Sequence, residues 1–177
     1  MKVLHTDRLT LRPWAESDID FAFDMYSRWD VKRYVGVVPR VMEDRAEAVE
    51  LIARLGAFDH PVHGHWVVAS AVTGEQFGTI LLKSIPASGD TEPLQPSGDT
   101  EIGWHFHPDA WGHGYASEAA VAVLAHAFDG GLERVVAVTH PENVASQAVC
   151  TRIGMLHHGQ TTAYYNATCE LFIGVPT

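Results

Sequence analysis

Hydrophobic periodicity in the first third of the chain predicts one strand followed by two helices. Apolar and polar positions alternate over residues 9–13, as in a half-buried strand, and Pro13 ends the strand because proline cannot donate a ladder hydrogen bond. A short helix is expected over residues 18–26, with Asp18 as its N-cap. A second helix is expected over residues 43–55, stopped by Gly56. We expect these helices to form one side of a cleft.

The middle of the chain predicts a hairpin, a polar loop and a further strand. Residues 66–70 and 77–85 are rich in Val, Ile, Leu and Phe and flank a Thr-Gly-Glu turn, which is the pattern of a β-hairpin. The sequence SGDTE then occurs twice, at 88–92 and at 97–101. Only the second copy leads into a strand-like segment, 101–107, so we interpret the first copy as a solvated loop insertion.

The last third alternates between helices and strands. Residues 115–128 are apolar on nearly every face, which predicts a helix buried against a sheet. A strand over 134–139, a helix over 143–153 and strands over 155–164 and 168–175 follow. The pattern therefore predicts an α/β fold, with a mixed central β-sheet of six to seven strands flanked by about four helices.

Composition and charge favour one globular domain and exclude polyanionic partners. Hydrophobic residues make up 46% of the chain and charged residues 19%, so we expect residues 1–177 to form a single domain. The formal net charge is −10, which repels phosphate backbones, and we expect no nucleic-acid partner. Any anionic ligand must therefore be held by a local anion-binding site, because the overall charge opposes its binding.

Cysteine usage and hydropathy indicate a soluble, cytoplasmic protein. Two cysteines do not make a disulfide framework in a chain with ample core. The first residues lack the apolar region of a signal peptide, and no apolar run is long enough to span a bilayer. We therefore expect no membrane partner.

A glycine-spaced turn precedes the long apolar helix. It has the sequence WGHGYASE over residues 111–118. Glycines let backbone N–H groups close around an anion, and the start of the following helix adds the positive end of its dipole. The turn could also be a tight strand-to-helix connection without a ligand. Neither the dinucleotide-binding pattern Gly-x-Gly-x-x-Gly nor the Gly-Lys-Ser/Thr pattern of P-loops is present.

The turn resembles the acyl-CoA signature of the GNAT acyltransferase family, Arg/Gln-x-x-Gly-x-Gly/Ala. Gly114 and Ala116 fill its last two named places, whereas Trp111 replaces the first. Trp-Gly-x-Gly-Tyr-Ala-x-Glu-Ala is similar to the form found in the ribosomal-protein N-acetyltransferase (RimJ/RimL-like) branch. TDRLTLRP at 6–13 and the NVAS and RIGM segments at 143–146 and 152–155 resemble the same branch, in the same order.

This resemblance implies a GNAT fold, an acetyl-CoA cofactor and direct transfer of the acetyl group to an amine in a ternary complex. It also allows a homodimer. Main-chain N–H groups of residues 104–107 would polarise the acetyl oxygen, and the turn would hold the pyrophosphate. The implied cofactor-binding residues are Trp104, His105, Phe106, His107, Trp111, Gly112, His113, Gly114, Tyr115, Ala116, Ser117, Asn143, Ser146 and Arg152. A catalytically silent acyl-CoA-binding module would keep the same turn.

Glu101, Ser146 and Tyr164 are the candidate catalytic residues. In an alternating strand Glu101 shares a face with His105, and a carboxylate with a raised pKa could deprotonate the incoming amine directly or through water. His105 is a second candidate base, and a salt-bridged Glu101 without a catalytic role is the alternative. The resemblance implies that Ser146 protonates the departing thiolate and that Asn143 contacts the pantetheine arm. Alternatively, Asn143 is only a helix N-cap and Ser146 faces solvent. Tyr164 stands near a position where some members of the branch carry a carboxylate.

The sequence contains little evidence about the acceptor and none for a metal site. The net charge suggests a cationic amine, either a protein N-terminus or a small amine such as a polyamine or aminoglycoside. None of the 11 histidines falls in a zinc-binding spacing, so we expect no metal. Cys150 is expected in the core or lining a tunnel, since it has no identifiable basic partner.

Overall fold

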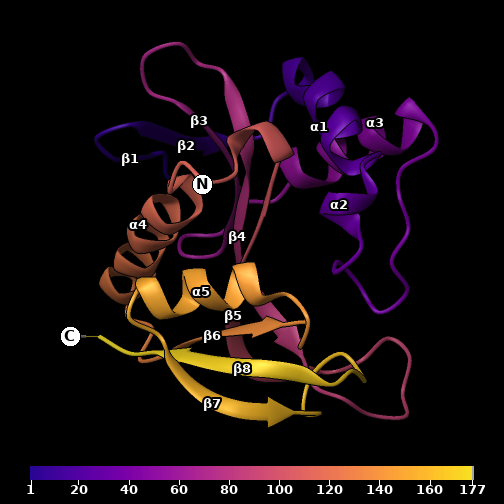
Figure 1. Cartoon of the computed structure of the whole chain (residues 1–177), viewed down its shortest axis with the longest axis vertical. Coiled ribbons are helices and arrows are strands. Elements are labelled where there is room, and N and C mark those ends of the chain that lie inside the picture. Colours follow the sequence, from indigo (N-terminus) through magenta and orange to yellow (C-terminus); the bar gives the residue numbers. More distant parts are fainter. Residues whose placement is uncertain (177) are drawn as a thin grey trace.

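The computed structural model describes residues 1–176, which form one continuous sheet with helices on both faces (Figure 1). The strand order in the sheet is β1-β2-β3-β4-β5-β6-β8-β7. The strands are β1 (Leu4–His5), β2 (Leu9–Pro13), β3 (Gly64–Ser70), β4 (Gln76–Pro86), β5 (Pro96–Phe106), β6 (Val135–Thr139), β7 (Leu156–Thr161) and β8 (Cys169–Gly174). The helices are α1 (Ile19–Tyr26), α2 (Trp29–Lys32), α3 (Arg45–Gly56), α4 (Tyr115–Asp129) and α5 (Val144–Arg152), with short 3₁₀ turns at Glu16–Asp18 and Pro108–Ala110.

The sheet opens between β5 and β6. Every other pair of neighbouring strands is antiparallel, whereas β5 and β6 run parallel and share one register pair, Glu101 with Val136. Beyond that pair the two strands separate towards their C-terminal ends. Backbone hydrogen-bonding groups on the facing edges are therefore free of strand partners there.

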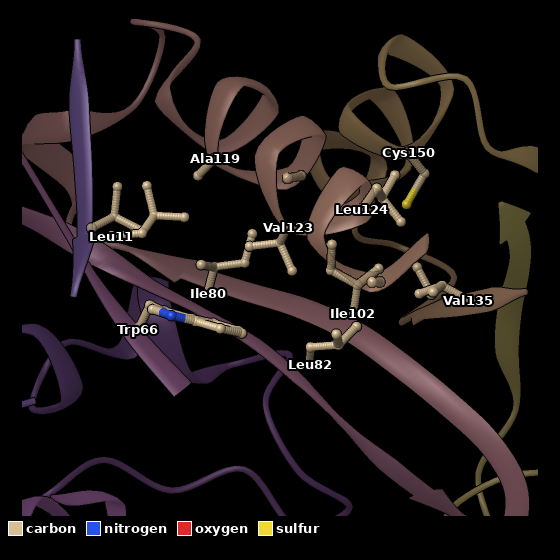
Figure 2. Packing of buried hydrophobic residues seen from close by; sticks show 14 of the residues in the cluster. Leu11, Trp66, Ile80, Leu82, Ile102, Ala119, Val123, Leu124, Val135 and Cys150 are labelled. Atoms are coloured by element: carbon tan, nitrogen blue, oxygen red, sulfur yellow. The ribbon is translucent and has the colours of Figure 1, made fainter. Parts of the chain in front are cut away.

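The main core lies between the sheet and the two C-terminal helices. Ile80 and Ile102 project from neighbouring strands towards Val123 of α4 (Figure 2), and all three side chains are fully buried or nearly so. Cys150 extends this core to α5 and is completely buried. The burial of these apolar side chains fixes α4 and α5 on one face of the sheet.

The opposite face carries the N-terminal helices, which are gathered together beside the strands in Figure 1, away from α4 and α5. Met25 of α1 and Ile52 of α3 pack with Val67 of β3 in a second cluster. Val67 pairs with Thr79, and β4 and β5 continue the same face with Lys83 and Glu101, which are also a register pair. α1 and α3 thus cover the face that carries the candidate base.

The sequence predicted the mixed α/β architecture, which the structure confirms, and missed two short elements. The sheet has eight strands rather than six to seven because of β1, and residues 1–176 contain five α-helices rather than about four because of α2. These elements have two and four residues, too few to show a hydrophobic period. β5 also begins at Pro96, so the second SGDTE copy belongs to the strand, whereas the first lies in a loop as predicted.

Asp18 occupies the N-cap position of α1, but its carboxylate does not cap the helix. It is completely buried and accepts two hydrogen bonds of 2.7 Å from the guanidinium of Arg12, with others from the Ala15 N–H and the Gln76 amide. Burial alone would raise the pKa of Asp18, but these donors outweigh it and lower the pKa. The Asp18 side chain therefore links the start of α1 to strands β2 and β4 instead of capping the helix.

No helix in residues 1–176 is both long enough and apolar enough to cross a bilayer.

Candidate functional site

A cavity of about 1000 Å³, here called the large cavity, lies where β5 and β6 separate. Its walls come from the segment after α2, from β5, from the turn before α4, from β6, from α5 and from residues 165–169. The predicted site residues that line it are Glu101, Trp104, His105, Phe106, Trp111, Gly112, His113, Gly114, Tyr115, Ala116, Ser117, Asn143, Ser146 and Arg152. His107 and Tyr164 do not line it.

The glycine-spaced turn has the backbone of an anion site. Gly112 and Gly114 both have φ of +80°, a left-handed conformation that side chains other than glycine's disfavour. Gly114 is the N-cap of α4 and offers no side-chain cap, so N–H groups in the first turn of the helix have no intrahelical partner. A 15-residue helix adds its dipole at that point. This end of the large cavity therefore suits a phosphate group.

The turn is fixed in place by the beginning of the chain. Glu118, in the first turn of α4, accepts hydrogen bonds from the Thr6 hydroxyl at 2.5 Å and from the Arg8 Nε at 2.7 Å. Arg8 Nη1 also donates to the carbonyl of His113, inside the turn, at 3.1 Å. Burial alone would raise the pKa of Glu118, but these donors lower it. We call these three residues, Thr6, Arg8 and Glu118, the N-terminal clamp.

We expect Glu118→Gln to loosen the turn without removing any group that touches a ligand. Loss of a charge-assisted contact costs on the order of 1–2 kcal/mol of unfolding free energy and raises the KM for acetyl-CoA a few-fold, with kcat nearly unchanged. Urea unfolding and initial rates measure the two effects. Glu75→Gln, at an exposed position in the turn before β4, serves as the control. An unchanged KM in the Glu118 variant would show that the clamp does not shape the cavity.

Two further contacts close the phosphate end of the large cavity. The indole Nε1 of Trp111 donates to the carbonyl of Phe106 at 2.9 Å, which satisfies one of the free edge groups of β5. Arg152, at the end of α5, donates to the hydroxyl of Ser117 at 2.9 Å. Trp111 is thus a wall of the site, and Arg152 supplies a positive charge beside the first turn of α4.

The edge of β5 presents main-chain donors to the large cavity. The N–H of His107 points the other way, because it donates to the carbonyl of Phe77 in β4 at 2.9 Å. Since successive N–H groups alternate along a strand, those of Phe106 and Trp104 face the gap where β6 has diverged. The N–H groups of residues 104–107 were expected to polarise the acetyl oxygen. Those of Trp104 and Phe106 point into the large cavity, whereas those of His105 and His107 face β4.

Glu101 is almost buried at the closed end of the gap. Its exposed fraction is 9%, and burial raises its pKa against the opposing effects of Lys83 and Tyr165. The hydroxyl of Tyr165 donates to Oε2, and Lys83 Nζ lies 3.7 Å from the same oxygen. Glu101 is therefore close to a cation, as the alternative of a salt-bridged, non-catalytic residue expected. Its carboxylate nevertheless lines the large cavity, and its pKa is raised.

Two histidines, His105 in β5 and His107 just after it, are poorly placed to act as bases. His105 lines the large cavity, with Nδ1 3.0 Å from the hydroxyl of Tyr26. Burial, with the positive charges of Lys32 and Lys83, lowers its pKa to about 3, so it would bind a proton only weakly. His107 is buried outside the cavity, where its Nε2 lies 3.1 Å from Asp24. Its expected place beside the pantetheine stays a prediction that this position does not favour.

At the start of α5, Asn143 is a helix N-cap, as in one interpretation, and both Asn143 and Ser146 line the large cavity, as in the other. The amide oxygen of Asn143 accepts from the Ser146 N–H at 3.2 Å, so Asn143 is an N-cap. Both residues nevertheless line the large cavity, and Ser146 is half-buried rather than solvent-facing. Cys150, one helical turn further on, is buried in the core, and burial raises the pKa of its thiol to about 12. It does not line the large cavity.

Two adjacent tyrosines have different roles. The hydroxyl of Tyr164 donates to Asp99 at 2.8 Å, and its ring packs on Ile85 and Val136 outside the large cavity. Tyr165, which the sequence analysis did not consider, lines the cavity and reaches Glu101. A catalytic role for Tyr164 stays a prediction, but the geometry favours Tyr165 beside the candidate base. A left-handed backbone at Tyr165 and Asn166 turns the chain there, and a sequence shows no period for such a turn.

Lys83 was also missed, because its place opposite Glu101 depends on the register between β4 and β5. Among residues 1–176, no group of three or more His, Cys, Asp or Glu side chains is arranged to hold a metal ion.

Comparison with known proteins places the chain in a family. The family described as "Acetyltransferase (GNAT) domain" matches residues 8–156. The chain is 30% identical to "Uncharacterized N-acetyltransferase YoaA" of Bacillus subtilis, over 92% of this chain and 87% of the relative. It is 31% identical to "FsC-acetyl coenzyme A-N(2)-transacetylase" of Aspergillus fumigatus, over 87% of this chain and 65% of the relative.

Solved structures share the fold. An acetyltransferase from Agrobacterium tumefaciens superposes with a TM-score of 0.76 at 27% identity, covering 99% of this chain and 95% of that one. A RimL ribosomal L7/L12 alpha-N-protein acetyltransferase in complex with coenzyme A has a TM-score of 0.78 at 16% identity, and 98% of each chain is covered. The family match over most of the chain, together with the relatives and the shared fold, establishes that this chain belongs to the GNAT acetyltransferase family and is an acyltransferase.

Proposed function

We propose that the protein transfers the acetyl group of acetyl-CoA directly to a primary amine, both substrates being bound together. The observation that carries this proposal is the large cavity, which joins an anion-binding turn at one end to a buried carboxylate of raised pKa at the other. A relative named as an acetyl coenzyme A transacetylase supports the choice of donor.

The residues present suit coenzyme A. In the proposal, main-chain N–H groups around Gly112, Gly114 and the first turn of α4 hold the pyrophosphate, because left-handed glycines and an uncapped helix start leave those donors free. Arg152 adds a positive charge nearby, which matters in a chain of net charge −10. The pantetheine arm lies between the separated strands β5 and β6, along Phe106 and Asn143. When bound, acetyl-CoA supplies the activated thioester.

The chain then supplies a base, oxyanion donors and an acid. Glu101 accepts the proton that the ammonium group of the acceptor must lose before it can attack. The N–H groups of Trp104 and Phe106 stabilise the negative charge on the acetyl oxygen; one such donor contributes roughly 10²–10³ in rate elsewhere. The Ser146 hydroxyl donates a proton to the departing thiolate, since it lines the large cavity and no hydrogen-bond partner holds that hydroxyl within residues 1–176.

The acceptor in this proposal is a primary amine, on a protein N-terminus or on a small molecule. Likeness to a RimL structure keeps the RimJ/RimL-like branch as the interpretation of the sequence motifs, although at 16% identity that likeness concerns the fold. The proposal also retains residues 1–177 as one domain in the cytoplasm, without a nucleic-acid or membrane partner, and allows a homodimer.

Calorimetry and a thiol-release assay test the proposal together. We expect the purified protein to bind CoA and acetyl-CoA in the micromolar range and to release free thiol from acetyl-CoA only when an amine acceptor is added. Failure to bind either form of the cofactor would overturn the proposal. Binding without transfer to any amine would leave a catalytically silent acyl-CoA-binding module instead.

A further inference from the structure

A second cavity lies on the face of the sheet covered by α1 and α3. It has a volume of about 380 Å³, and we call it the small cavity. Three residues, Leu81, Lys83 and His105, line both cavities, so the small cavity adjoins the end of the large one at which Glu101 lies. Its size falls in the range of small-molecule sites. An acceptor whose amine lies at Glu101 would extend into it past Lys83.

The small cavity is basic in a protein that is acidic overall. Its lining includes two permanent cations, Arg54 in the last turn of α3 and Lys83 of β4, and no Asp or Glu. The remaining ionisable groups of the lining are uncharged: burial and the nearby cations lower the pKa of His65 to about 4 and that of His105 to about 3. The formal net charge of −10 therefore misrepresents this part of the surface.

Two of the three cations in this region have no ion pair in the described part of the chain, whereas the third, Lys83, lies 3.7 Å from Oε2 of Glu101. Within residues 1–176, Arg54 forms no ion pair. Lys32 forms none there either; it lines neither cavity, but its Nζ lies 5.4 Å from the ring centroid of Tyr26, which is part of the lining. Lys32 is half-buried, and burial lowers its pKa. A half-buried cation without a partner costs free energy that a bound anion would recover.

Resting on the proposed function, we infer that the acceptor is a small amine that also carries a carboxylate, with the amine at Glu101 and the carboxylate in the small cavity near Arg54, Lys83 and Lys32. This reverses the expectation of a cationic acceptor, which rested on net charge alone. A polyamine or an aminoglycoside would bring further positive charges against these three side chains, whereas an amino acid or a longer ω-amino acid matches both the base and the cations.

Matched acceptors test this inference. Amino acids and ω-amino acids are each assayed beside the corresponding C-terminal amide, with spermidine as an acceptor that has no carboxylate. We expect at least one acid to exceed its amide roughly tenfold or more in kcat/KM, the effect of one charge-assisted contact. Acetylation of amides or spermidine with equal or greater efficiency, or acetylation of none of the acids, overturns the inference. The proposed function fails only if acetyl-CoA is not bound or no amine at all is acetylated.

Variants separate a local charge effect from general damage. In Arg54→Gln and Lys32→Gln, we expect kcat/KM for the preferred acid to fall about tenfold while the value for its amide stays within about twofold. Arg45→Gln, on the exposed surface of the same helix and paired with Asp20, is the matched control and should keep the acid-to-amide ratio. Equal losses for acid and amide in the two test variants would contradict a carboxylate site.

Discussion

In Glu101→Gln we expect kcat for acetyl transfer to fall by about 10²–10⁴, with the affinity for acetyl-CoA within about twofold of the wild type. General-base catalysis contributes a factor of that size, and the amide keeps the shape of the side chain but cannot accept the proton. Glu101 faces the acetyl-transfer end of the large cavity rather than the anion-binding turn, so binding of the cofactor does not depend on its charge. Initial rates and calorimetry on the same preparation measure both quantities.

The pH profile distinguishes a base from a structural carboxylate. Burial raises the pKa of Glu101, so its ionised, active form appears only as the pH rises above the usual value for a glutamate of 4.5. The activity of the wild type should therefore rise with pH on the acidic side of its pH–rate profile. The profile of Glu101→Gln should lack this rise. Glu75→Gln, at an exposed position, should keep both the rise and the rate. A variant at position 101 that retains more than half of kcat would assign the proton transfer to another group or to water.

For Gly114→Val we expect the affinity for CoA to fall by roughly tenfold to a hundredfold. Gly114 has φ of +80°, and a β-branched residue there costs on the order of 1–3 kcal/mol, so the turn relaxes to another conformation. Binding the pyrophosphate then requires the strained geometry to be restored, and that cost appears in the binding free energy. An added Cβ would also stand 3.6 Å from the guanidinium of Arg8. Calorimetry with CoA measures the change.

Gly74→Val is the matched control for this substitution. Gly74 has φ of +74° in the exposed turn between β3 and β4, and an added Cβ meets nothing within 4 Å. Both variants therefore carry similar backbone strain and should lose similar stability to urea. Only the variant at position 114 should lose affinity for CoA. Equal affinities in the two variants would remove the turn from the proposed cofactor site.

Most of the fold was predictable because its elements are long enough to show a period. The seven longer strands and four longer helices were all predicted, although β5 begins five residues before its predicted start and β7 ends three residues before its predicted end. β1 and α2 were missed for lack of length. Asp18 shows a different limit. Its type and position fit an N-cap, yet Arg12 and Gln76 compete for the carboxylate, and their proximity depends on the packing of three separate segments.

The site was predictable where it lies on one continuous segment. The residues of the turn, 111–117, and those of β5 from 101 to 106 line the large cavity together, and their part in binding stays a prediction. His107 and Tyr164 do not line that cavity, whereas their neighbours Phe106 and Tyr165 do, because one residue along a strand or loop reverses the direction of a side chain. The pairing of Glu101 with Lys83 and Tyr165 depends on strand register and on a left-handed turn, which a local pattern does not reveal.

If the glycine-spaced turn binds the cofactor as proposed, the N-terminal clamp makes that binding depend on completion of the fold. Thr6 and Glu118 are 112 positions apart in the chain, yet their contact, with that of Arg8, holds the turn that we propose binds the phosphates. A partly folded chain in which the first strand has not yet docked would have α4 but an unsupported turn. Occupancy by CoA would in return protect the amides of β2 from hydrogen exchange, because whatever favours the closed turn also favours the docked strand.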